Sequence, residues 1–85
     1  MKNGNKEELL NIPGVGKNTK HDLNILGIGK VSDLKNKNPL YLYDRLCEIT
    51  GKKQDRCVLY VYKCAVYYAE GGREAKKLCW WNWKD

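Results

Sequence analysis

The sequence has no phenylalanine, one histidine and two prolines among its 85 residues, and it has no long apolar run. A membrane-spanning helix needs about 20 consecutive apolar residues, so no such span is expected. The N-terminal segment is polar and charged, without the apolar stretch of an export signal. We therefore expect a soluble protein of the cytoplasm that has no membrane partner.

The four cysteines lack the short paired spacing of a zinc site, and the only histidine, His21, lies far from them in the sequence. The cysteines are Cys47, Cys57, Cys64 and Cys79. We predict reduced thiols that pack as small apolar side chains, with no bound metal and no other cofactor. His21 has no serine or cysteine beside it in a nucleophile motif, and no acidic pair stands out. The sequence thus predicts a protein that is not an enzyme.

Positive charge is in excess, with 16 Lys and Arg against 10 Asp and Glu, which gives a formal net charge of +6. Such an excess is typical of nucleic-acid-binding surfaces, but it is also ordinary for a small soluble domain, so charge alone leaves both interpretations open. The apolar fraction of 42% is that of a folded chain. The length predicts a single domain over residues 1–85.

Apolar spacing, capping residues and helix stops predict an all-α protein, a compact bundle of about five short helices. The predicted helices cover residues 6–11, 17–26, 32–35, 39–50 and 55–70. Asn5 is a candidate cap of the first helix, with Glu8 completing a capping box. The fourth helix has Asn38 as its cap and a proline at its first position, and Gly51 follows its end.

The fifth predicted helix is the longest, and we expect it to be the central packing element. Its predicted buried stripe consists of Val58, Val61, Ala65 and Tyr68, with Cys57 and Cys64 beside it. The stripe predicted for the fourth helix consists of Leu40, Tyr43, Leu46 and Cys47. Leu23 and Leu26 are predicted to share one face of the second helix. In the tyrosine pairs 41/43 and 60/62, one ring is expected inside and the other near the surface.

The segment Ile12-Pro13-Gly14-Val15-Gly16-Lys17 carries the most information about function. A tight turn between two helices needs backbone angles that glycine adopts without strain, and Val15 is expected to plug between the helices. The first N–H groups of the next helix then lack intrahelical partners and, with the helix dipole, can hold a phosphate. The predicted phosphate-binding residues are Gly14, Val15, Gly16, Lys17, Asn18, Thr19 and Lys20. The alternative is a purely structural turn.

A weaker internal echo follows, in which Val31 and Leu34 precede a short turn and another helix but no Gly-x-Gly is present. This arrangement is interpreted as a degenerate second hairpin paired with the first. Its candidate contact residues are Lys35, Lys37 and Asn38. A short loop between two helices is common, so the echo itself carries little weight.

The chain resembles the small pathogenicity-locus family of helix-hairpin-helix proteins, some of which are labelled mitomycin-resistance proteins. The resemblance runs from about residue 9 to residue 85. Its marks are Ile-Pro-Gly-Val-Gly-Lys at 12–17, Leu-Gly-Ile at 26–28, Val-Ser-Asp-Leu at 31–34, Leu-Tyr-Asp-Arg-Leu-Cys at 42–47, Asp-Arg-Cys-Val-Leu at 55–59, Ala-Val-Tyr-Tyr-Ala at 65–69 and Trp-Trp-Asn-Trp at 80–83. The resemblance implies one intact helix-hairpin-helix and a presumed DNA-binding role. Such motifs usually have alanine at the position of Lys20, so this lysine either holds the two helices further apart or adds a phosphate contact.

The C-terminal tail holds three tryptophans, Trp80, Trp81 and Trp83, which could stack on unpaired bases or seal the helical core. The core interpretation is preferred because a domain of this size is short of apolar bulk. For the whole chain, the sequence predicts a non-catalytic, largely sequence-independent module that binds double-stranded DNA. The alternative is an adaptor for a protein partner, with a structural hairpin and exposed aromatic rings.

Overall fold

The computed structural model describes residues 8–83, which form an all-α globule. Its α-helices are α1 (Lys17–Ile25), α2 (Pro39–Thr50) and α3 (Arg56–Ala69). Four short 3-10 helices accompany them: η1 (Leu9–Asn11), η2 (Val31–Leu34), η3 (Ala75–Leu78) and η4 (Trp80–Trp83). In this part of the chain, no helix is both long and apolar enough to cross a membrane.

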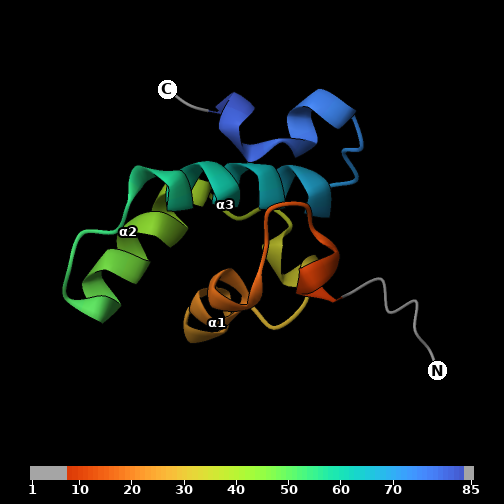
Figure 1. Cartoon of the computed structure of the whole chain (residues 1–85). Coiled ribbons are helices and arrows are strands. Elements are labelled where there is room, and N and C mark those ends of the chain that lie inside the picture. The colour runs from red at the N-terminus through yellow and green to blue at the C-terminus, as the bar shows by residue number, and fades with distance from the viewer. Residues whose placement is uncertain (1–7, 84–85) are drawn as a thin grey trace.

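Helix α3 lies at the centre of the molecule (Figure 1), as the sequence predicts. Helix α2 packs against it, while η3 and η4 lie along one side and the segment from η1 to η2 lies on the other. Because α3 is covered from several directions, most of its side chains contribute to the core. Its buried residues are Leu59, Val61, Tyr62, Cys64, Ala65, Val66 and Ala69.

This coverage corrects the predicted stripe on α3. Val58 and Tyr68 are only partly buried, whereas Leu59, Tyr62 and Val66 are enclosed. The periodicity of the sequence identified a helix but not the rotation about its axis, because packing on several sides makes the buried surface broader than one stripe.

A similar shift occurs on α2, where Leu42, Tyr43 and Leu46 are buried but Leu40 is 49% exposed. The prediction of Leu40 as a core residue is therefore wrong, since it lies in the first turn of α2 and is not enclosed by the rest of the fold. The predicted alternation within the tyrosine pairs is confirmed: Tyr43 and Tyr62 are enclosed, and their partners are more exposed.

The two shortest predicted helices are 3-10 turns. In place of a helix over residues 6–11 there is η1, which begins at Leu9, and the Glu8 side chain accepts a hydrogen bond from the Leu10 N–H. The candidate cap Asn5 lies outside the described residues. In place of a helix over residues 32–35 there is η2. Each is only three or four residues long, and α-helical hydrogen bonds cannot stabilise so short a segment.

The tryptophan tail is mostly packed. Trp80 lies against the core and Trp83 is partly buried, its indole Nε1 donating to the Lys77 carbonyl at 2.7 Å. Trp81 is 54% exposed and meets Trp80 edge-on, with 5.7 Å between the ring centroids. The core interpretation thus holds for Trp80, whereas Trp83 lies beside Tyr67, with 5.8 Å between the ring centroids, and Trp81 is a surface residue.

Candidate functional site

The turn over residues 12–16 is tightly built and begins at a buried anchor. The side chains of Ile12 and Val15 are buried, and the Val15 N–H donates to the Ile12 carbonyl at 3.0 Å. Val15 therefore plugs the space beneath the turn, as predicted. This residue of the predicted site therefore serves the core, and its backbone N–H is already used within the turn.

The two glycines of this turn have different reasons to be glycine. Gly14 has φ of +89°, in the region that side chains disfavour, and a Cβ there would lie 3.1 Å from Trp80 Cδ1. Gly16 is extended, with φ of −101°, and a Cβ there would meet nothing within 4 Å. The expectation that both glycines are needed for the backbone is wrong. Gly14 is favoured by its left-handed backbone and by the nearby ring of Trp80, whereas a side chain at position 16 would have open space around it.

That open space adjoins the N-terminus of α1. Gly16 is the N-cap and provides no side chain, and the first intrahelical hydrogen bond runs from the Lys20 N–H to the Gly16 carbonyl at 2.9 Å. Within residues 8–83, the N–H groups of residues 17–19 have no acceptor. Three aligned donors at the positive end of a helix dipole can chemically hold an anion.

The side chains around these donors differ in how accessible they are to a ligand. Lys17 and Asn18 are exposed and Thr19 is partly buried. Lys20 is engaged, since its Nζ lies 3.1 Å from Glu8 Oε1, and this pair joins η1 to α1. The hydrogen bond with the Lys20 ammonium lowers the pKa of the Glu8 carboxyl from its ordinary value. Of the two predicted lysines, Lys17 therefore has the more available charge.

At the second predicted hairpin, the helix that follows is capped by a side chain. Lys35 and Lys37 are exposed, but the Asn38 side chain is used by its own helix. Asn38 Oδ1 accepts from the N–H groups of Leu40 at 2.9 Å and Tyr41 at 3.4 Å. The donors at the N-terminus of α2 are thus satisfied from within the chain. Helix α3 is closed in the same manner by Asp55, whose Oδ1 accepts from the Cys57 N–H at 3.1 Å.

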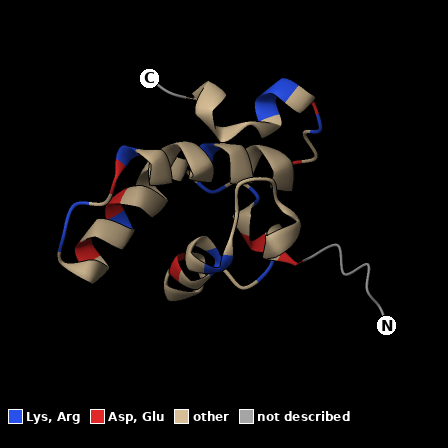
Figure 2. Ribbon diagram, viewed as in Figure 1, with Lys and Arg blue, Asp and Glu red and all other residues tan. Residues whose placement is uncertain are grey.

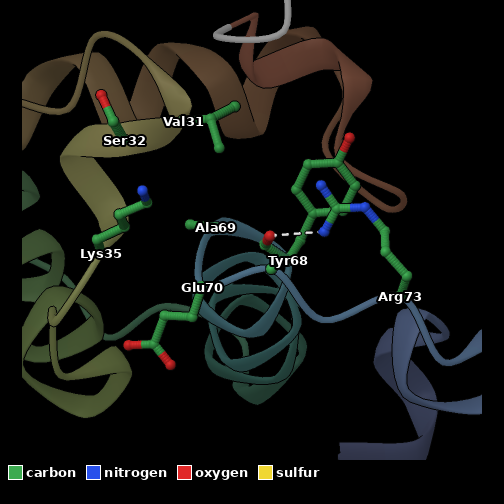
Figure 3. A pocket seen from close by; sticks show the side chains of 8 residues that line it. Val31, Ser32, Lys35, Tyr68, Ala69, Glu70 and Arg73 are labelled. Atoms are coloured by element: carbon green, nitrogen blue, oxygen red, sulfur yellow. Dashed lines mark hydrogen bonds between the residues drawn. The ribbon is translucent and has the colours of Figure 1, made fainter.

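A surface pocket lined in part by Lys35 lies at the C-terminal end of α3 (Figure 3). The Arg73 guanidinium lies 3.7 Å from the centre of the Tyr68 ring and donates to the Tyr68 carbonyl at 2.8 Å. Glu70 accepts from the Asn36 N–H at 3.2 Å. Arginine near a helix C-terminus can satisfy the last carbonyls, so the Arg73 contact caps α3, and the Glu70 contact ties the end of α3 to the link before α2.

Charge and cysteine placement add no second site. Basic segments are spread over several elements instead of one face (Figure 2). Residues 8–83 contain no group of three or more His, Cys, Asp or Glu side chains able to hold a metal ion, and the four cysteines form no disulfide. Burial raises the pKa of the Cys64 thiol to about 11, and this thiol donates to the Leu78 carbonyl at 3.3 Å. Cys64 therefore helps hold the tail on α3.

Sequence reasoning missed a groove beside the candidate site. It is lined by Leu10, Lys17, Lys20, His21 and Asn24. The helical spacing of the last four could have revealed one face of α1, because they are three, four and seven residues apart. Nothing in the sequence indicates that Leu10, unlike the buried Leu9, is 43% exposed and borders this face.

Comparison with known proteins places the chain in a family. A curated relative, the mitomycin resistance protein McrB of Streptomyces lavendulae, is 26% identical over 83 residues, which cover 98% of this chain and 76% of the relative. No solved structure gives a significant match. The sequence profile of Cdd1, described as pathogenicity locus, matches residues 2–85. The resemblance drawn from the motifs is confirmed, and the chain belongs to the Cdd1 pathogenicity locus family.

Proposed function

We propose that this protein is a non-catalytic DNA-binding module that contacts the phosphate backbone through the N-terminus of α1 and is largely indifferent to base sequence. In this proposal, η1, the 12–16 turn and α1 act as a helix-hairpin-helix whose first arm is a single 3-10 turn. Double-stranded DNA is the proposed partner. The contact residues are those of the turn and the first helical turn, with Lys17 as the principal charge.

The observation that carries the proposal is the uncapped start of α1. Gly16 provides no side chain there, whereas Asn38 and Asp55 close the starts of α2 and α3. Free backbone donors at a helix N-terminus favour a phosphate oxygen, both by hydrogen bonding and through the helix dipole. The absent Cβ at Gly16 lets a backbone phosphate approach.

The exposed Lys17 adds the charge that a backbone contact requires. Phosphate contacts position a protein on the duplex but carry no sequence information, so binding of this kind is expected to ignore sequence. The first helical turn contains no acidic residue to oppose it. Weak, salt-sensitive binding is therefore the expected behaviour.

A titration of a fluorescein-labelled DNA duplex, followed by anisotropy at several salt concentrations, tests the proposal. With three or four phosphates neutralised, log K should fall against log salt with a slope of about −3. Lys17→Ala should weaken binding for every sequence and reduce the slope by about one. The matched control is Lys53→Ala, which removes an exposed lysine between α2 and α3.

A Lys17→Ala protein that binds like the unchanged protein at every salt concentration would contradict the proposed contact. Chemical-shift mapping gives a second test, since amide signals of residues 17–19 should move before those of α3 when duplex DNA is added. A complete lack of DNA binding at low salt would favour the alternative, a protein-interaction adaptor. The exposed rings of Trp81 and Tyr41 are the observation that supports that alternative.

A further inference from the structure

A groove lies beside the start of α1, between that helix and η1. The groove is shallow and open to solvent. It is lined on α1 by Lys17, Lys20, His21 and Asn24, and on η1 by Leu10. From Lys17 to Asn24 the helix rises about 10 Å, at roughly 1.5 Å per residue. The groove therefore begins at the proposed phosphate site and extends well beyond the space that one phosphate fills.

The lining of this groove suits an anionic, partly apolar ligand. None of its five residues is acidic, and two are lysines. The Asn24 side-chain amide donates to the Ile28 carbonyl at 3.1 Å, so this residue is fixed at the far end. Leu10 is 43% exposed and offers an apolar surface without contributing to the core.

One carboxylate stands close to the groove, and it is held by one of the lining lysines. Glu8 Oε1 lies 3.1 Å from Lys20 Nζ, and both side chains are about one-third exposed. An ion pair at such a site is weak, because water screens it. A phosphate oxygen can therefore compete with Glu8 for the Lys20 ammonium.

We infer that this groove receives the next sugar–phosphate unit of the DNA strand whose phosphate is held at the start of α1. The sugar packs on Leu10, and the phosphate accepts hydrogen bonds from Lys20 and His21. Glu8 competes with that phosphate for Lys20 and so limits affinity. This inference rests on the proposed function, which it extends from one backbone phosphate to two successive ones.

The test uses the full chain and a fluorescein-labelled duplex of arbitrary sequence, with anisotropy measured at low and moderate salt. His21→Ala should weaken binding about fivefold, which corresponds to the net contribution of one ordinary hydrogen bond. Leu10→Ser should weaken it by a similar factor through lost contact with the sugar. The matched control is Ile49→Ala, because Ile49 is also 43% exposed but lies on α2.

Glu8→Gln should change DNA affinity in the opposite direction, and it is the more diagnostic variant. Glutamine keeps an oxygen that accepts from the Leu10 N–H but has no charge to hold Lys20. Binding should become about threefold tighter, as expected when a weak competing ion pair is removed. Unchanged or weaker binding by Glu8→Gln would overturn the inference, as would normal binding by both His21→Ala and Leu10→Ser.

Failure of the inference can be told apart from failure of the proposed function. If Lys17→Ala weakens binding and the groove variants do not, the single phosphate contact stands and the groove inference falls. If Lys17→Ala has no effect either, the proposed function falls as well. Should a groove variant fail to fold, the His21 ring signals of the unchanged protein decide: they should shift on adding the duplex, and constant signals would overturn the inference.

Discussion

The segments that lead into α1 and α2 have the same order of elements. Each begins with a 3-10 helix, η1 or η2, continues through a short link and leads into an α-helix. Each link contains one residue in the left-handed region, Gly14 at φ +89° and Asn36 at φ +64°. Lysines lie in or beside both links. By connectivity and charge, the starts of α1 and α2 are alike.

The two helix starts differ in the residue at the cap. Gly16 leaves the first donors of α1 without a partner, and Asn38 satisfies those of α2 with its own oxygen. They differ also in what covers the left-handed residue, because Gly14 lies against the tail, at Trp80. At these two helix starts, the cap residue and not the nearby charge decides whether the backbone donors are open to a ligand.

The largest expected effect concerns the turn before α1. Gly14→Ala should lower the free energy of unfolding by about 2 kcal/mol, because the backbone is left-handed there and the methyl would press on Trp80. For a domain of this size the thermal midpoint should fall by roughly 10 °C. The control is Gly16→Ala, which should cost less than about 1 kcal/mol, because only the N-cap preference is lost and a Cβ there meets nothing within 4 Å. Equal melting of the two variants would refute the distinction between these glycines.

The next largest effect is expected when the start of α1 is given a side-chain cap like that of α2. Gly16→Asp should give α1 a side-chain cap, leaving stability unchanged or raised by a few tenths of a kcal/mol. DNA affinity should fall at least tenfold, since the carboxylate occupies the donors and repels phosphate, a difference of about 1.4 kcal/mol. Anisotropy titration and a thermal melt of the same protein check both parts. A stable Gly16→Asp protein that binds DNA normally would exclude the start of α1 as the contact.

The smallest effect is expected when the side-chain cap of α2 is removed. Asn38→Ala should lower stability by about 1 kcal/mol, because the donors of Leu40 and Tyr41 lose their acceptor. The midpoint should fall by roughly 4–8 °C. Asn18→Ala, a change at an exposed position within α1, is the control and should melt close to the unchanged protein. An Asn38→Ala protein as stable as this control would show that the two helix starts do not differ in the way described.

Features set by neighbouring residues were predictable from the sequence. The glycine turn, the start of α1 at Lys17 and the start of α2 at Asn38 and Pro39 all follow from local backbone preferences. The same holds for the end of α2 at Gly51, where φ is +73°. Such preferences act over a few residues, so they can be recognised without knowledge of the fold.

Features set by distant residues were not predictable. The ring that crowds Gly14 belongs to Trp80, at the other end of the chain, and the groove depends on how η1 lies beside α1. The pairing of Lys20 with Glu8 also requires that placement.

The sequence by itself thus determined the all-α class, the turn and the starts of α1 and α2, because caps and left-handed positions are local. Only the tertiary structure decided which face of α3 is buried and that one glycine supports the tail while the other leaves donors open. Burial and approach depend on which segments meet in space, and no short window of sequence contains that information.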